Sequence, residues 1–359
     1  MHEMHQQINA MNLHIFDTLK SPSVRSRRLA AVAMLGVVAI VGSGCVQMSL
    51  DDLGTASSQI PAKTLAEMRA KQMAPQSPVL VRLFKEESEL EVWKQDASGR
   101  YALLKSFPIC RWSGKLGPKK NDGDRQAPEG FYSVSKGMLN PKSQYYLSFN
   151  LGYPNRLEAA LGYSGTALMV HGACSSSGCY AMTDQGVGEI YAVVATALDG
   201  GQKTFQVQAF PFRMTAANMA QHRGDPNFEF WKTMKAGYDA FEATRQEPQI
   251  AACGGKYIVN AQFAGGAPKD PLAACPPRLD APDPAVAARA TAEETQLAAL
   301  IEKDGPTHMT AYVDGGMHPS FRALLKENGA KKLAAKISNI EYPVSRPEAA
   351  LADPYVGED

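Results

Sequence analysis

The arrangement of hydrophobic and polar residues from position 79 to position 210 is typical of β-strands. Aliphatic and aromatic residues partly alternate with polar ones, and glycine, proline and aspartate separate the runs. This pattern predicts strands over 79–84, 89–95, 101–109, 130–134, 145–149, 166–171 and 204–210. The polar segment 115–130, which is rich in glycine and proline, is predicted to be a loop.

Helices are predicted where apolar residues recur every three or four positions. The pattern predicts helices over 187–200, 215–223, 227–246 and 282–305, a strand near 251–263, and an irregular tail after the last helix. The apolar side chains of 227–246 fall on roughly one face, which is typical of core packing. The expected fold class is therefore a mainly β domain over 79–212 with one or two helices. An α+β accessory region over 213–359 is expected to follow it.

The first 44 residues have the pattern of a bacterial export signal. Four basic residues precede the apolar run 29–42, which is shorter than the roughly 20 residues of a membrane-spanning helix. Cys45 follows three small residues, as in a lipobox, although Gly42 stands where leucine is usual. We expect 1–44 to be a lipoprotein-type signal peptide and Cys45 to carry lipid. An ordinary cleaved signal and an uncleaved anchor are the alternatives.

The expected location follows from this signal. A lipid on Cys45 would attach the protein to a membrane, and we expect the periplasm, at the outer membrane. Residues 45–78 are predicted to be a tether that contains one short helix.

Composition and charge indicate a folded protein of nearly neutral charge. Of the 359 residues, 45% are hydrophobic and 20% are charged, and the formal net charge is +1. The length suggests about two domains, and the charge gives no reason to expect nucleic acid as a partner. The sequence contains no GxxxxGK loop and no CxxC pair, so neither a cofactor nor a metal is expected.

The cysteines suggest two disulfides and one free thiol. If Cys45 carries lipid, five cysteines remain, and an odd number in an oxidising compartment leaves one unpaired. Cys253 and Cys275 flank a segment rich in glycine and proline and are expected to form one pair. Cys110 and Cys174 are the second pair by elimination, unless Cys174 is a packed free thiol.

The stretch VHGACSSSGCYAMTD contains the candidate reactive groups, His171 and Cys179. A free thiol titrates near pH 8.5, so a neighbouring imidazole is needed to generate the nucleophilic thiolate at neutral pH. His171 ends a predicted strand, and the backbone next to Gly172 is open enough for a carbonyl to orient the imidazole.

The turn before the cysteine is a candidate oxyanion site. A run of serine and glycine would let the amides of Gly178, Cys179 and Tyr180 point at one spot, where they could stabilise a tetrahedral intermediate. By spacing alone, a core histidine near a packed thiol is the more common explanation for such a pair.

Three segments resemble the YkuD-type L,D-transpeptidase catalytic domain of exported bacterial cell-wall enzymes, and this resemblance implies a β-sandwich with one or two helices. They are CRWSGKLGPKKNDGDRQAPEGFYSV, FNLGYPN and LMVHGACSSSGCYAMTD, in this order. The base of this family falls on His171 and its nucleophile on Cys179. The resemblance implies a cysteine enzyme that acts on peptidoglycan stem peptides containing meso-diaminopimelate, without a metal.

Two features differ from the usual family pattern and resemble the YafK branch of the family. Ser177 stands where transpeptidases usually have histidine, and the gap between the HG and GC segments is short. The best-understood member of this branch is the meso-diaminopimelate protein amidase, and the resemblance continues to about residue 260. It implies hydrolysis of the amide between an outer-membrane protein and peptidoglycan. A transpeptidase that forms cross-links or attaches protein is the alternative, because both reactions pass through a thioester.

The loop 115–130 contains the candidate substrate-binding residues. Arg125 is the main candidate, because a guanidinium binds a carboxylate through two parallel hydrogen bonds and diaminopimelate stems are rich in carboxylates. A solvated arginine, or one paired with Asp122 or Asp124, is the alternative. Lys119 and Tyr180 are weaker candidates.

Other classes of function fit the sequence less well. In a papain-like protease the histidine follows the cysteine at a long distance, and no such motif surrounds His222, His308 or His318. A zinc site at the histidine–cysteine stretch lacks a fourth ligand. A non-catalytic lipoprotein that binds the cell wall is the alternative from another class.

Overall fold

The structure is a computed structural model that describes residues 48–50, 53, 57–304, 312–338 and 342–352. All of these belong to one compact unit, Gln47–Asp359. The predicted signal peptide and Cys45 lie outside the described residues. In the described part of the chain, no helix has the length and apolar character that crossing a membrane requires.

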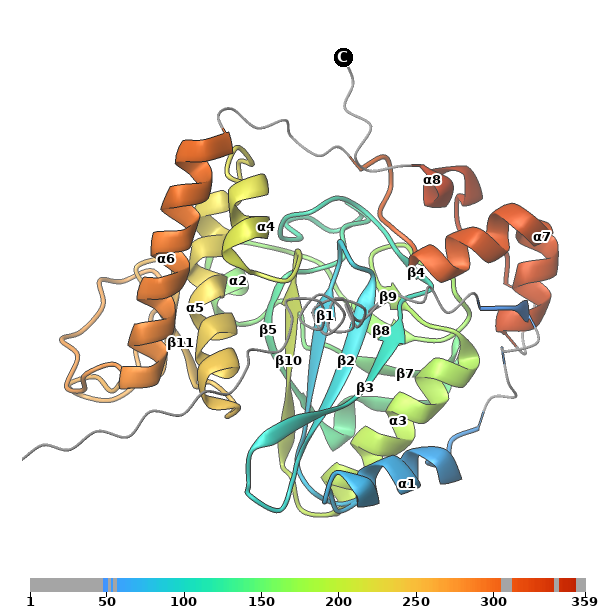
Figure 1. Cartoon of the computed structure of the whole chain (residues 1–359), viewed down its shortest axis with the longest axis horizontal. Helices are drawn as coiled ribbons and strands as arrows, with labels where there is room; N and C mark the ends of the chain where they lie inside the picture. Colours follow the sequence, from blue (N-terminus) through green and yellow to red (C-terminus); the bar gives the residue numbers. More distant parts are fainter. Residues whose placement is uncertain (1–47, 51–52, 54–56, 305–311, 339–341, 353–359) are drawn as a thin grey trace, which may run out of the picture. The chain divides into compact units, whose positions relative to one another are not determined.

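Two five-stranded sheets form the centre of the molecule (Figure 1). The first contains, in order, β3 (Tyr101–Pro108), β2 (Glu89–Gln95), β1 (Val79–Phe84), β10 (Thr204–Phe210) and β5 (Gly130–Ser135). The second contains β4 (Arg111–Trp112), β9 (Tyr180–Ala181), β8 (Met169–His171), β7 (Tyr146–Asn150) and β6 (Leu139–Ser143). The short helices η2 (Lys136–Met138) and α2 (Arg156–Ala160) lie in the connections.

The main hydrophobic core joins the two sheets. Phe149 of β7 packs edge-on against Phe205 of β10, with ring centroids 5.6 Å apart. Strand β1 is buried at every position, which explains its nearly continuous run of apolar residues. The helix α3 (Asp184–Asp199) begins at the N-cap Thr183, contacts strands of both sheets and is buried along its apolar face. The predicted fold class, a mainly β domain with few helices, is confirmed.

The segment before the first strand packs onto this domain. It contains α1 (Ala62–Ala70), where the side chain of Met68 is fully buried in the main core. The hydroxyl of Thr64 donates a hydrogen bond to Glu189 of α3. This part of the predicted tether is therefore folded against the β-sheets and not free.

Residues 213–304 form what we call the helical layer. It contains α4 (Ala216–Gln221), α5 (Phe228–Thr244), the hairpin of β11 (Ile250–Cys253) and β12 (Lys256–Val259), and α6 (Pro284–Asp304). The three helices lie side by side in Figure 1. As the spacing predicts, Trp231, Met234 and Tyr238 of α5 are buried, whereas Phe228 and Phe230 are partly exposed.

The prediction of an irregular tail was wrong. The chain forms α7 (Pro319–Ile337) and α8 (Pro347–Leu351), on a different side of the sheets from the helical layer (Figure 1). Gly329, at φ 78°, interrupts α7 and breaks the helical periodicity on which the prediction depends. We call the described residues 312–338 and 342–352 the C-terminal arm. Its apolar side chains, including Phe321, Leu324 and Leu333, form a second core around Cys110 and Cys174.

Candidate active site

Strand register places His171 and Cys179 on the same face of the second sheet. Strands β8 and β9 pair in parallel, with Val170 opposite Tyr180 and His171 opposite Ala181. Cys179 therefore comes opposite Met169, whose amide donates a hydrogen bond to its Sγ at 3.4 Å. Because side chains alternate along a strand, Met169, His171 and Cys179 share one face. His171 and Cys179 line one cleft of about 730 Å³.

The imidazole of His171 is held in one orientation. Its Nδ1 lies 2.7 Å from the carbonyl oxygen of Gly172, and the ring is only 3% exposed. A carbonyl accepts hydrogen bonds but cannot donate them, so Nδ1 carries the proton and Nε2 is the basic nitrogen. Burial lowers the pKa of His171 to about 4, although the bond to Gly172 opposes this shift. The ring is therefore neutral at pH 7.

Gly172 fits where no other residue would. A Cβ at this position would lie 2.6 Å from Oδ1 of Asp184 and 2.8 Å from the carbonyl oxygen of Tyr145. The carbonyl that orients His171 is therefore held by close packing. On the other side, the ring of Tyr145 covers the imidazole, with centroids 4.7 Å apart.

Cys179 is the free cysteine in the part of the chain that the structure describes. Burial raises the pKa of its thiol, and the Met169 amide and the charge of Lys119 oppose that increase only in part. The thiol and the imidazole are therefore both neutral before substrate binds. In such a pair the histidine removes the proton during attack and acts as a general base.

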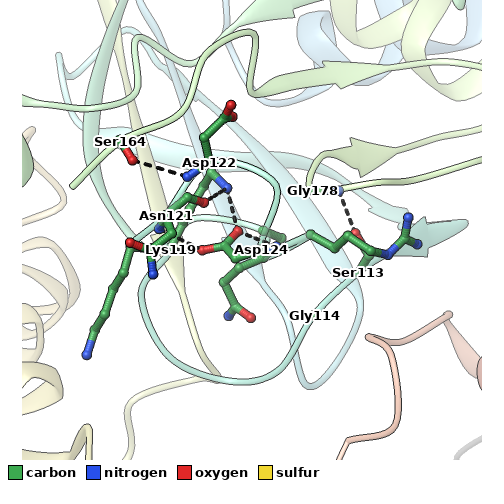
Figure 2. A network of polar contacts seen from close by, with 12 residues as sticks. Ser113, Gly114, Lys119, Asn121, Asp122, Asp124, Ser164 and Gly178 are labelled. Carbon is green, nitrogen blue, oxygen red and sulfur yellow. Dashed lines mark hydrogen bonds and ion pairs between the residues drawn. The ribbon is translucent and has the colours of Figure 1, made fainter.

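Two of the predicted oxyanion donors, the amides of Gly178 and Cys179, are occupied by serine hydroxyls. The Gly178 amide donates to Oγ of Ser113 at 2.6 Å, and the Cys179 amide donates to Oγ of Ser176 at 3.2 Å (Figure 2 shows the first). The two hydroxyls lie 3.0 Å apart. In this structure the turn amides therefore bind serine hydroxyls and do not face open space in the cleft.

Tyr180 and Lys119, the weaker candidates for substrate binding, contact other parts of the protein in this structure. The fully buried Tyr180 donates its hydroxyl to the carbonyl oxygen of Pro128 at 2.7 Å. Lys119 is buried, forms an ion pair with Asp124 and donates to the carbonyl oxygen of Asn121. Figure 2 shows Asp124 at the centre of this loop. The ion pair and the hydrogen bond of Lys119 hold the loop in place. Neither Tyr180 nor Lys119 is among the residues that line the cleft.

Arg125 does line the cleft, and its partners differ from the predicted ones. Its guanidinium donates to Oγ of Ser177 at 2.8 Å and to Oδ2 of Asp314 at 3.1 Å. The alternative pairing with Asp122 or Asp124 is therefore wrong. Sequence reasoning missed Asp314, because it lies 189 positions away along the chain in the segment interpreted as an irregular tail.

A disulfide anchors the loop that precedes the nucleophile. Cys110 is bonded to Cys174, and Cys253 to Cys275, which are the pairs that the sequence analysis favoured. Ala173 and Cys174 both have positive φ, 65° and 50°, a conformation that costs energy in residues with a side chain. The disulfide helps to hold the loop in this shape. The described residues contain no cluster of three or more metal-ligating side chains.

The chain is similar to proteins of one known family. Residues 78–208 match the model of the YkuD L,D-transpeptidase catalytic domain. A protein of Escherichia coli (strain K12) named "Putative L,D-transpeptidase YafK" is 46% identical over 208 residues, which are 58% of this chain and 82% of the relative.

Two solved structures share weaker similarity. The helical cell shape determining protein Pgp2 of Campylobacter jejuni is 17% identical, with a TM-score of 0.31, over 52% of this chain and 79% of that chain. Bd1075 of Bdellovibrio bacteriovorus is 16% identical, with a TM-score of 0.27, over 44% and 52%.

Proposed function

The chain belongs to the family of YkuD L,D-transpeptidase catalytic domains, and from this premise we propose that it is a cysteine amidase of the cell wall. The proposed substrate is the amide between diaminopimelate in peptidoglycan and a covalently attached outer-membrane protein. The observation that carries the proposal is the pair of His171, at the end of β8, and Cys179, directly before the adjacent β9, which line one cleft. The fixed tautomer of His171 gives this pair a base with a free Nε2.

The proposed reaction has two steps. Nε2 of His171 removes the thiol proton while Sγ of Cys179 attacks the diaminopimelate carbonyl; the C–N bond breaks and the proton passes to the leaving amine. A thioester on Cys179 remains. Water then attacks the thioester, and His171 accepts a proton from this water and returns it to the sulfur. The products are a free carboxylate, a free amine and the original thiol.

Transfer to an amine is the second candidate for the last step. It is favoured by the name of the 46% identical relative, "Putative L,D-transpeptidase YafK". Hydrolysis is favoured by Ser177 and by the short gap between His171 and Cys179, which are similar to the amidase branch. Both outcomes use the same pair and the same thioester.

Mass spectrometry of the products tests the proposal. A diaminopimelate muropeptide with a linked protein fragment is incubated with the protein in water enriched in oxygen-18. We expect release of the fragment, with one heavy oxygen atom in the diaminopimelate carboxylate. A product joined to a second amine, without heavy oxygen, would show transfer. Cys179→Ala is the matched control, and turnover by this variant would exclude the mechanism.

We also propose that the protein is an outer-membrane lipoprotein exposed to the periplasm. Support comes from the lipobox-like sequence before Cys45 and from two disulfides, which form in oxidising compartments. Labelled fatty acid should be incorporated into the wild-type protein and not into Cys45→Ser. If the wild-type protein incorporates no label, the lipid anchor is excluded and plain export remains.

A further inference from the structure

The C-terminal arm contributes a carboxylate to the edge of the cleft. Asp314 is 5% exposed and lies within ion-pair distance of three arginines. They are Arg111 at 3.9 Å, Arg125 at 3.1 Å and Arg346 at 3.3 Å. One carboxylate cannot neutralise three guanidiniums, so this cluster keeps an excess of positive charge. The arm lies outside the matched family domain, 78–208.

The three arginines differ in their exposure to solvent. Arg111 is fully buried and donates to carbonyl oxygens of Trp112, Asp314 and Gly316, so it attaches the arm to β4. By contrast, the side chain of Arg125 is 30% exposed and that of Arg346 is 58% exposed. The excess charge that a ligand can reach therefore lies on these two residues.

Arg125 and Arg346 are held next to each other, because both guanidiniums bind the same oxygen, Oδ2 of Asp314. Arg125 itself lines the cleft that contains Cys179. Arg346 directly follows Ser345, which also lines this cleft and accepts a hydrogen bond from the Ser176 amide at 3.1 Å. The two guanidiniums thus come from distant parts of the sequence to one edge of the cleft.

The arm has further contacts that fix its position. Tyr342 stacks on Tyr145, with centroids 4.9 Å apart, and Tyr145 in turn covers His171. The apolar core of the arm packs around the disulfide between Cys110 and Cys174. The arm therefore contacts the tyrosine that covers the base, the disulfide of the loop before the nucleophile, and Arg125.

We propose that Arg125 and Arg346 form one anion-binding site, to which the C-terminal arm supplies the second guanidinium. Two adjacent guanidiniums match a ligand with carboxylates close together, since each can bind a carboxylate through paired hydrogen bonds. The ligand class is a peptide rich in carboxylates. The identification of this peptide as a diaminopimelate stem rests on the proposed function, whereas the preference for anions does not.

Binding measurements in the inactive Cys179→Ala background test the site without turnover. The probes are the peptide L-alanyl-γ-D-glutamyl-meso-diaminopimelate and the same peptide with its carboxylates amidated. We expect Cys179→Ala to bind the acid more tightly than the amide. Adding Arg346→Ala should weaken binding of the acid about tenfold, in line with the loss of a charged hydrogen bond, and leave binding of the amide unchanged.

Arg278→Ala is the matched control, because Arg278 also pairs with an aspartate, Asp280, but does not line the cleft. It should change neither affinity. A loss for Arg125→Ala with none for Arg346→Ala would exclude the contribution of the arm. Equal affinity for acid and amide in Cys179→Ala would exclude an anion site altogether. Neither result concerns the proposed hydrolysis, which the product analysis of the active protein tests separately.

Discussion

The helical layer and the C-terminal arm both follow the β-sheets in sequence, but they contact them in different ways. The helical layer buries aromatic side chains: Trp231 is fully buried, and Phe131 of β5 packs edge-on against Tyr257 at 5.1 Å. The arm instead places Asp314, Ser345 and Arg346 at the edge of the catalytic cleft. One segment therefore mainly stabilises the first sheet, and the other also shapes the active site.

Among substitutions in the helical layer, we expect Trp231→Ala to cause the largest loss of stability. Its indole is fully buried and donates Nε1 to Oε2 of Glu129 at 2.8 Å. The substitution should lower the free energy of unfolding by about 3–5 kcal/mol, the usual cost of removing a buried tryptophan. Urea denaturation measures this loss. If the layer has only a stabilising role, kcat/KM of the remaining folded enzyme should stay within about twofold at a temperature where the variant is folded.

Two results would contradict this assignment. A drop in kcat/KM of tenfold or more in folded Trp231→Ala would show that the layer takes part in the reaction. Phe228→Ala is a useful control on the same helix, because this side chain is only partly buried. It should cost clearly less stability than Trp231→Ala.

Each of the two disulfides belongs to one of these regions. Cys110–Cys174 lies in the core of the C-terminal arm, and Cys253–Cys275 lies in the helical layer. In the chain-entropy model, the loop of 64 positions closed by Cys110–Cys174 and that of 22 positions closed by Cys253–Cys275 contribute about 4 and about 3 kcal/mol. Replacing either pair by serine should therefore reduce stability to a similar extent. Only the Cys110→Ser/Cys174→Ser variant should also lose activity, because its disulfide holds the loop before Cys179.

Thermal unfolding and kcat/KM, measured on both double variants, check this prediction. Equal activity in the two variants would mean that the loop keeps its shape without the disulfide. Loss of activity in Cys253→Ser/Cys275→Ser alone would reverse the roles of the two regions.

The sequence predicted the layer far better than the arm. Strands such as β1 and the apolar face of α5 follow local periodicity, which is visible within a few residues. The pair of His171 and Cys179 was found because a short motif contains both. The contact of Asp314 with Arg125 depends on tertiary packing between residues 189 positions apart, so no local sequence pattern predicts it. Likewise, the hydroxyls of Ser113 and Ser176 that occupy the turn amides could not be placed from sequence.

A pH dependence of stability should report on the burial of His171 in the second sheet. Burial lowers the pKa of His171 to about 4 in the folded protein, from an ordinary value of 6.5. Between these values the unfolded chain binds the proton and the folded protein does not, so stability falls as the pH falls from about 6.5 to about 4. One proton corresponds to about 1.4 kcal/mol per pH unit. Above pH 6.5 and below pH 4, His171 adds no further slope.

Urea denaturation of the wild-type protein and of His171→Gln at several pH values isolates this contribution. The difference in unfolding free energy between the two proteins should change across pH 4 to 6.5 and stay constant above it. If the unfolding free energies of the two proteins changed in parallel with pH over the whole range measured, His171 would not be held neutral by burial.

The smallest effect is expected for Ser177→Ala. Ser177 is exposed, and its hydroxyl accepts a hydrogen bond from Arg125, which Asp314 of the arm also holds. Loss of one exposed hydrogen bond costs about 1 kcal/mol or less, so KM should rise less than about fivefold and kcat should be nearly unchanged. The neighbouring Ser176 is buried and accepts from the Cys179 amide. Ser176→Ala should therefore reduce kcat more than Ser177→Ala, and steady-state kinetics of both variants would reveal the opposite order if Ser177 itself acted in catalysis.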